Sequence, residues 1–347
     1  MDKGQGVIVG VDGSDSSWIA LDWAYREAAR RRTRLRVLHV RGIAHPLQHW
    51  LRRRSAAAPP GSDRVLEEVD GHLPELADAP ASVEKSAPAA KLSTLSPAPD
   101  LVEYSKDAEL LVLGAVGSSG TREHLFGSTA LRCAASSACP TVIVREQPHE
   151  VRRVLAGIDG SPNQLDVLRW AFNEADRHRA ELRVVHVIWP WEWPPYSESE
   201  TAQAARQMVR FAVEQLPASP SGRGVSVVAE VVRHKHPAQE LLDRARDADL
   251  LVCGSLGTGS GEVSASLVHA AAKHLRGAAE AGSGAGSEAA SAADRTAHAF
   301  PSHVVVVPTE PEPKFSWEWD ELVEEERDWN RQQFAPQPDD VMRFELP

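Results

Sequence analysis

One loop of the sequence has the glycine spacing of a phosphate-binding motif. Two residues separate Gly114 from Gly117, and nine separate Gly117 from the pair Gly127 and Ser128. Glycine lets a backbone approach a ligand closely, and amide groups at a loop and at a helix N-terminus attract phosphate. Ser128 stands where its hydroxyl would cap the following helix or donate to a phosphate oxygen. The alternative is that these glycines serve only tight turns and close helix packing.

Other residue types that could do chemistry follow short apolar runs. Asp12 comes after the run Val7–Val11, where its carboxylate would either contact a ligand or accept hydrogen bonds from the turn. His39 and His186 end two further runs, and packing or hydrogen bonding explains them better than ligation. His234 and His236 lie two apart, without further ligands that would make a metal site. We therefore expect no metal site.

These residues recur because the chain contains a repeat. Residues 7–40 align without a gap to residues 154–187 at an offset of 147, and 17 of the 34 positions are identical. The segment DAELLVLGAVG at 107–117 likewise matches DADLLVCGSLG at 247–257. The repeating unit is about 150 residues long, which is the size of a domain.

The elements that must position the loops alternate between strand and helix. Each unit begins with a run that is apolar on both faces, which is typical of a buried parallel strand. An N-cap serine then starts a helix at Ser14 and at Ser161, where Pro162 would be the first helical residue. Further strands are predicted at 35–40, 110–113, 182–187, 225–232 and 250–253, and helices at 129–135 and 238–245. This order predicts an α/β fold with a doubly wound parallel sheet in each unit.

The combined motifs resemble the universal stress protein family. VGVDGS at 9–14, LLVLGAVG at 110–117, LFGSTA at 125–130 and CPTVIV at 139–144 match its pattern. The resemblance covers residues 5–145 and, more loosely, residues 152–308. It implies two tandem Rossmann-like domains, of residues 1–148 and 149–308. It also implies that the final strands, Val142–Val144 and Val304–Val307, pair the halves into an intramolecular pseudo-dimer.

The resemblance further implies an ATP site in the first unit and leaves open whether Mg²⁺ accompanies the nucleotide. Asp12 would lie near the adenosine, and the backbone of Val40 would meet the adenine. Ribose and phosphates would be held by a set of loop and helix residues, namely Gly114, Gly117, Gly127, Ser128 and Thr129.

The second unit departs from this pattern in its phosphate loop. Asp159, Val187, Gly254 and Gly257 are present, but only five residues separate Gly257 from Val263–Ser264, where nine and a Gly-Ser pair are expected. We therefore expect one competent site and one degenerate site.

The segments outside the repeat and the net charge of the chain indicate which partners the protein could bind. Residues 277–299 contain 17 Gly, Ala or Ser among 23 and are interpreted as a flexible insertion, and Arg52–Arg54 as a solvated face. The net charge is −11, of which −8 belongs to the Trp-rich tail 308–347, with 12 acids and four basic residues. This balance, without a concentrated basic face, disfavours nucleic-acid and membrane-surface binding. The acidic tail (309–347) remains a candidate site for a protein partner or for docking on its own body.

The sequence supports three hypotheses of function. The first is a nucleotide-binding regulatory or stress protein that is not a catalyst. The second is an ATP-using enzyme related to the PP-loop pyrophosphatases, on a faint likeness of VDGSDSS at 11–17, and the third is an interaction protein that acts through its tail. With three cysteines, no apolar run long enough to span a bilayer and no signal peptide, the predicted location is the cytoplasm.

Overall fold

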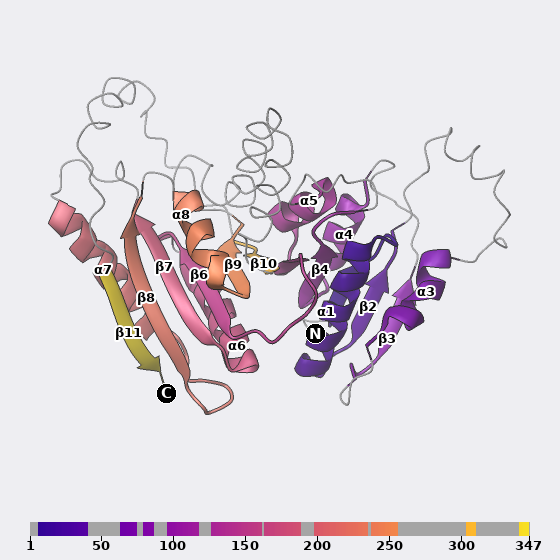
Figure 1. Cartoon of the computed structure of the whole chain (residues 1–347), viewed down its shortest axis with the longest axis horizontal. Helices are drawn as coiled ribbons and strands as arrows, with labels where there is room; N and C mark the ends of the chain where they lie inside the picture. Colours follow the sequence, from indigo (N-terminus) through magenta and orange to yellow (C-terminus); the bar gives the residue numbers. More distant parts are fainter. Residues whose placement is uncertain are drawn as a thin grey trace, which may run out of the picture.

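The computed structural model describes residues 6–40, 63–74, 79–86, 96–117, 126–161, 163–188, 198–234, 237–255, 303–309 and 340–346. Its strands form one sheet in the order β11-β8-β7-β6-β9-β10-β5-β4-β1-β2-β3 (Figure 1). The sheet therefore runs from β3, in the first unit, to β11, near the C-terminus. The two repeats are halves of a single structure rather than separate sheets.

The first unit supplies five strands and four described helices. Its strands are β1 (Val7–Gly10), β2 (Leu35–Leu38), β3 (Val83–Ser86), β4 (Leu110–Gly114) and β5 (Thr141–Val144). Its helices are α1 (Asp15–Arg31), α3 (Arg64–His72), α4 (Ala98–Ser105) and α5 (Ser128–Ser136). All pairs among these strands are parallel, as the sequence predicted.

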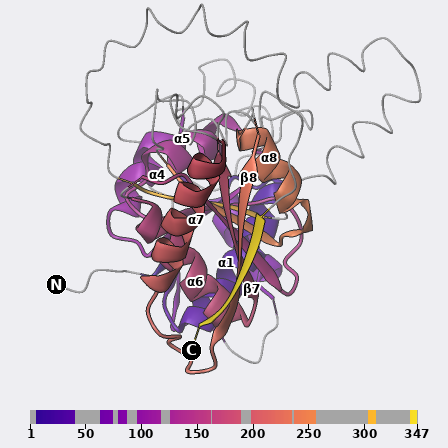
Figure 2. The ribbon, with the colours of Figure 1, turned by 90° about the vertical axis from the view of Figure 1, so that its left-hand side faces the viewer.

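The second unit repeats this arrangement and adds an edge strand. Its strands are β6 (Arg153–Ile158), β7 (Glu181–Ile188), β8 (Val225–Arg233), β9 (Leu250–Gly254) and β10 (His303–Val307). Its helical segments are α6 (Gln164–His178), α7 (Glu198–Glu214), α8 (Pro237–Arg244) and the 3₁₀ turn Ala245–Asp247. The tail contributes β11 (Asp340–Leu346), which pairs antiparallel with β8 and was not predicted as a strand (Figure 2).

The two units meet where β5 and β10 pair antiparallel. His303 lies opposite Val144, and Val306 opposite Thr141. This pairing confirms the predicted contact between the final strands of the two halves. A parallel sheet in each unit thus becomes a mixed sheet in the whole molecule.

Helices cover both faces of the sheet, and buried side chains alternate between them. Val7 and Val9 of β1 lie in a cluster with residues of α1, α3, α6 and α7, whereas Ile8 lies on the opposite face beneath α4 and α5. This alternation follows the two-residue period of a strand. Helices cover both faces of the sheet, so side chains on both sides of a strand are buried. This explains why the predicted strand segments are apolar throughout rather than alternating with polar residues.

Two helix starts differ from the sequence prediction. Ser14 caps α1 as predicted, and its side chain accepts a hydrogen bond from the Ser17 amide. α6 instead begins at Gln164, because the Ser161 amide donates to Asp159 and the chain makes a further turn first. Ser128 is also not a cap, because Gly127 holds the N-cap position of α5.

Candidate functional site

The candidate site lies at the carboxyl ends of β1 and β4. β1 continues through α1 to β2 on one side, whereas β4 lies on its other side, so the winding of the sheet reverses between these two strands. Ligands of open α/β sheets bind in the crevice that such a reversal leaves. Both predicted motifs, Asp12–Ser14 and Gly114–Gly117, follow these strands.

The loop after β1 is fixed by its own side chains. The Ser14 amide and hydroxyl donate to Asp12 Oδ1 over 3.0 and 2.6 Å. Gly13 between them has φ of +83°, a conformation that favours glycine. This turn keeps the exposed carboxylate of Asp12 at the end of β1. Its second oxygen, Oδ2, points toward the neighbouring loop.

The loop after β4 packs against the first turn of α1. A Cβ placed on Gly114 would lie 2.6 Å from both the carbonyl and the hydroxyl oxygen of Ser16, so no larger residue fits without a shift. The Val116 amide donates to the Ser16 hydroxyl over 3.3 Å. Ser16 thus links the two loops. Sequence reasoning missed it, although it lies within the quoted segment VDGSDSS.

The three predicted parts of the site are Asp12, the loop Gly114–Gly117 and Gly127, and they come together around Gly117. A Cβ on Gly117 would lie 2.9 Å from Asp12 Oδ2, and one on Gly127 would lie 3.5 Å from the Gly117 amide nitrogen. The Gly127 amide donates to the Ala115 carbonyl over 2.6 Å and closes the loop at its far end. Residues 118–125 of this loop lie outside the described residues.

Helix α5 starts beside this point without a side-chain cap. Gly127 is its N-cap residue, and Ser128 and Thr129 occupy its first turn. An uncapped helix N-terminus presents free amide groups and a partial positive charge, which suit an anion. The structure therefore places Asp12, Gly117, Gly127, Ser128 and Thr129 at one edge of the sheet.

Val40 occupies a different position from the loop residues. It follows β2 and is buried in a cluster with Leu38 and Leu113. Beside it, the His39 ring approaches both oxygens of Asp63, at 2.8 and 3.0 Å, and Asp63 also caps α3. This confirms that His39 is a hydrogen-bonded histidine.

The second unit has the equivalent turn, with the same bond from the serine amide. Asp159 Oδ1 accepts a hydrogen bond from the Ser161 amide over 3.0 Å. The His186 ring donates from Nδ1 to the Ile158 carbonyl, and burial lowers the pKa of this imidazole despite that bond. The segment from Gly257 to Ser264, where the glycine pattern breaks down, lies outside the described residues, so the degenerate site stays a prediction.

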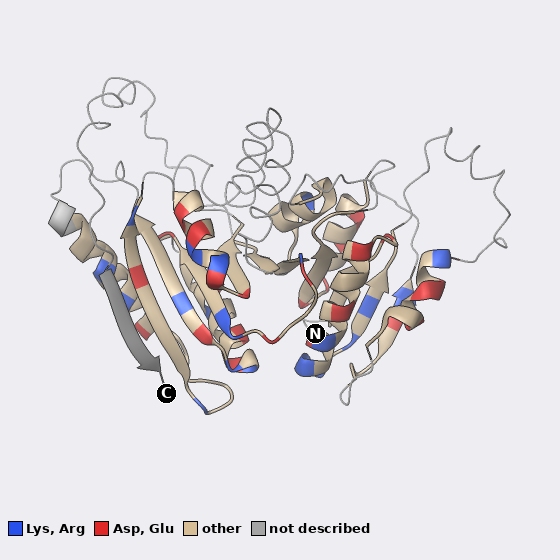
Figure 3. Ribbon diagram, in the orientation of Figure 1, with Lys and Arg blue, Asp and Glu red and all other residues tan. Residues whose placement is uncertain are grey.

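Other predicted features also fall on residues that are not described. They are Arg52–Arg54, the insertion at 277–299, His236 and residues 310–339 of the acidic tail. Among the helices of the described residues, none combines the length and the apolar character needed to cross a membrane. Figure 3 shows acidic and basic residues interspersed along the described ribbon of both units.

A second polar cluster lies between the units and was not predicted. It joins equivalent residues of α1 and α6, which the offset of 147 relates in pairs: Glu27 with Glu174, Arg30 with Arg177, and Arg31 with His178. Arg31 bonds Glu27 over 2.6 Å and Glu174, in the other unit, over 2.5 Å. The repeat alignment contains this signal, but only the antiparallel pairing of β5 and β10 brings the two helices together.

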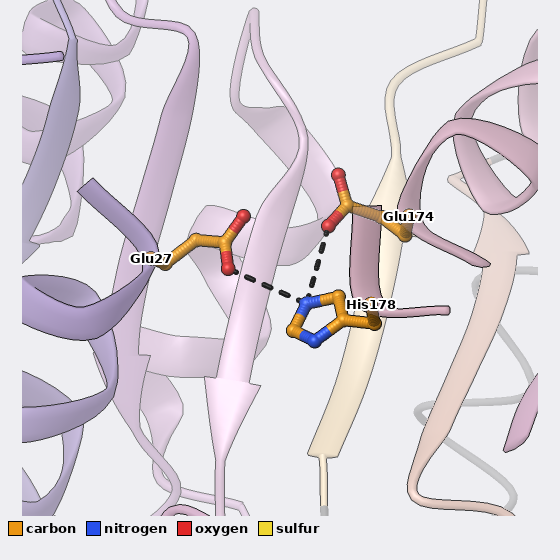
Figure 4. Close-up of side chains that lie close together, drawn as sticks. All are labelled: Glu27, Glu174 and His178. Carbon is orange, nitrogen blue, oxygen red and sulfur yellow. Dashed lines mark ion pairs between the residues drawn. The ribbon is translucent and has the colours of Figure 1, made fainter. Parts of the chain in front are cut away.

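The charges in this cluster favour ion pairing over metal binding. His178 Nε2 lies 3.4 Å from Glu27 Oε2 and 3.7 Å from Glu174 Oε2, as Figure 4 shows. These three side chains have the types and spacing of metal ligands. However, Arg30 and Arg31 bind Glu27, while Arg31 and Arg177 bind Glu174. A cation would have to enter beside three guanidinium groups, so the cluster acts as an ion-pair seam.

Burial and charge set the ionisation of this seam. Burial raises the pKa of Glu27, but Arg31, His178 and Arg30 outweigh it and hold that pKa well below its ordinary value. Burial likewise lowers the pKa of Arg31, and Glu174 and Glu27 more than reverse this effect. Glu27 is therefore a buried carboxylate that stays charged.

Comparison with known proteins places the chain in a family. The model of the universal stress protein family matches residues 5–145 and again residues 150–276. The chain belongs to the universal stress protein family. A universal stress protein of Mycobacterium tuberculosis strain H37Rv is 32% identical over 272 residues, which cover 73% of this chain and 87% of the relative. One of Mycolicibacterium smegmatis is 32% identical over 274 residues, 73% of this chain and 88% of the relative.

A solved structure supports the fold. A universal stress protein from Archaeoglobus fulgidus has a TM-score of 0.54 at 16% identity, covering 89% of this chain and 99% of that chain. The fold is therefore the Rossmann-like α/β fold of tandem universal stress protein domains, as the sequence predicted.

Proposed function

We propose that the protein binds ATP in its first unit and acts as a regulatory, nucleotide-responsive member of the universal stress protein family rather than as an enzyme. One observation carries the proposal: Asp12, Gly117 and the uncapped start of α5 meet at the reversal point between β1 and β4. Mg²⁺ would accompany the phosphates if the nucleotide binds as its metal complex.

Each part of this arrangement suits one part of the nucleotide. The amides of Ser128 and Thr129, in the first turn of α5, would donate hydrogen bonds to phosphate oxygens. Asp12 Oδ2 offers an acceptor for a hydroxyl or amino group of the nucleoside. Val40, buried beside Leu38, marks the end of β2 where the adenine would lie.

The predicted location belongs to the same proposal. Cys133, Cys139 and Cys253 are free and buried thiols, and burial raises the pKa of each to about 12. Thiols with such a pKa react slowly as nucleophiles, so they fit packing rather than chemistry. Free thiols are in keeping with a reducing cytoplasm.

Replacement of Gly127 by alanine tests the nucleotide site. A Cβ at Gly127 would lie 3.5 Å from the Gly117 amide nitrogen and 3.6 Å from the Ala115 carbonyl, which are ordinary contacts, and its φ of −71° suits alanine. The fold should therefore tolerate Gly127→Ala, whereas a phosphate should lose its close approach to the backbone. We expect at least about tenfold weaker binding of a fluorescent ATP analogue, equivalent to about 1.4 kcal/mol.

The matched control is Gly71→Ala, in the body of α3, where a Cβ meets nothing within 4 Å. This variant should bind like the wild type. The absence of saturable ATP binding by the full chain, or equal binding by wild type and Gly127→Ala, would overturn the proposed site.

A further inference from the structure

We infer that the second unit is a structural part of the first unit's nucleotide site, because Phe126 and β10 together position the phosphate loop. This inference rests on the proposed function and adds a positioning residue to it. Phe126 directly precedes Gly127 and is 5% exposed. It is the last residue before the backbone that would meet the phosphates.

Phe126 joins α5 to residues of the other unit. Ala130 and Ala134 are four residues apart and lie on one side of α5, and Phe126 directly precedes the N-cap residue of this helix. All three belong to a single buried cluster that includes Val304 and Val306 of β10. The helix α5 therefore lies against a strand of the second unit, and Phe126 shares its buried cluster.

The strands beneath α5 come from both units. Val304 of β10 lies opposite Ile143 of β5 in the antiparallel pair, and both side chains enter the cluster with Phe126. Val305 points to the opposite face and joins the cluster of α1 and α6. α5 thus rests on two adjacent strands, one from each unit, at the place where the sheet is continuous between them.

The other end of the loop is held at the same strands. The Ala115 amide donates to the Val144 carbonyl over 2.9 Å, and the Ala115 carbonyl accepts from the Gly127 amide. Val144 in turn lies opposite His303 of β10. Both ends of the loop are therefore fixed at the junction of β5 and β10. Backbone groups at these two ends that are held in place before binding lose less conformational freedom when the ligand arrives, which strengthens affinity.

Two valines on one strand provide the test. Val304→Ala and Val305→Ala remove the same atoms from adjacent, buried positions of β10, but only Val304 faces α5. ATP binding would be measured on full-length chains by titration of a fluorescent analogue, below the unfolding transition of each variant. We expect Val304→Ala to weaken binding about fivefold and Val305→Ala to change it less than about twofold.

A second pair separates positioning from general stability. Phe126→Ala should weaken ATP binding by about tenfold or more, and Phe126→Leu should restore it to within about threefold of the wild type, because leucine keeps the apolar anchor. If the wild type binds ATP but Val304→Ala and Val305→Ala bind alike, the inference is wrong and the proposed function stands. If the wild type does not bind ATP, both are wrong.

Discussion

Asp12 and Asp159 hold equivalent positions in the two repeats, and each accepts a hydrogen bond from the amide of the serine two residues later. Asp12 accepts two hydrogen bonds from Ser14 and approaches the backbone of Gly117. Asp159 accepts from the Ser161 amide, and the segment that follows β9 departs from the glycine spacing of the first unit. At the scale of single residues, the two carboxylates share a local bond, so the difference in role that we propose depends on the glycine spacing of the loops that follow β4 and β9.

The substitution Asp12→Asn tests the role of this carboxylate. Asparagine keeps an acceptor for Ser14 but loses the charge, and a hydrogen bond to a charged group contributes about 1.5–3 kcal/mol. We expect ATP to bind at least about tenfold more weakly in a calorimetric titration.

Asp159→Asn is the matched control for that measurement. Its binding should stay within about twofold of the wild type, because the nucleotide is proposed to occupy the first unit. A larger loss in Asp159→Asn than in Asp12→Asn would place the site in the second unit instead.

The sequence predicted the positions of most site residues because local chemistry determines them. The glycine spacing and the Asp-Gly-Ser turn depend on close backbone approach, which is visible in residue types. Ser16 was missed because a serine inside a helix start has no distinctive pattern. The hydrogen bond from Val116 to Ser16 depends on how β4 lies beside α1, which is a tertiary contact.

At the scale of elements, helix caps show how far local rules reach. Ser14 was predicted as a cap and is one, whereas Ser161 was predicted as a cap and is not. For Ser128, capping was one of two predicted roles, and it is not a cap. At Ser161 the amide bonds Asp159, and at Ser128 the cap position falls one residue earlier, on Gly127. Such shifts of one or two residues depend on the turn that precedes the helix.

The strand β11 was not predicted, although MRFEL at 342–346 alternates apolar and polar residues as a strand does. Its own residues do not show that it pairs with the edge of β8, which is a tertiary contact. It pairs along the whole span from Val225 to Val231.

Removal of β11 should expose an aggregation-prone edge. β8 has the apolar sequence VSVVAEVVR, and an unpaired strand of this kind pairs readily with other chains. A chain that ends at residue 339 should therefore self-associate in a concentration-dependent way, as measured by light scattering, at concentrations where the full chain does not.

A charge on the freed edge provides the control. Ser226 is an exposed residue of β8, and Ser226→Lys in the truncated chain should reduce the association, because lysines protect edge strands. A truncated chain that scatters light like the full chain would show that β11 does not protect this edge.

At the scale of the whole molecule, the ion-pair seam links acid stability to the contact between units. The pKa of Glu27 is lower in the folded chain than its ordinary value of about 4.3. A carboxylate with a lowered pKa stabilises the fold fully above its unfolded pKa, and this stability is lost as the pH falls through the folded pKa. The seam should thus weaken only in acid.

Glu27→Gln should remove this acid-sensitive contribution. Arg31 would keep Glu174 but lose one buried partner, so we expect the free energy of unfolding at pH 7 to fall by about 3 kcal/mol in urea titrations. The loss should shrink as the pH falls below the ordinary pKa of a glutamate, because first the unfolded and then the folded wild type takes up the proton.

The control is Asp22→Asn on the same helix. Asp22 pairs with Arg26 on a part of α1 that is more exposed, so its loss should cost about 0.5 kcal/mol or less. Equal effects of the two substitutions, or a loss in Glu27→Gln that does not depend on pH, would contradict a charged, buried Glu27.

The arrangement of the whole molecule was predicted in outline. The repeat and the resemblance predicted two α/β units joined by their last strands, and the pairing of β5 with β10 confirms this. The seam between α1 and α6 was not predicted, because neither helix alone shows what its Glu and Arg residues face. Contacts between the units can be predicted only when the geometry of the sheet is known.

The position of β10 also has a consequence for biosynthesis. It lies at the centre of the sheet, yet β5, its neighbour, ends at Val144 and β10 begins only at His303. At about 5–20 residues per second, a ribosome needs about 8–30 s to translate the intervening residues. Throughout that interval the nascent first unit carries an open strand edge, so newly made chains on neighbouring ribosomes are at greatest risk of mispairing before the second half emerges.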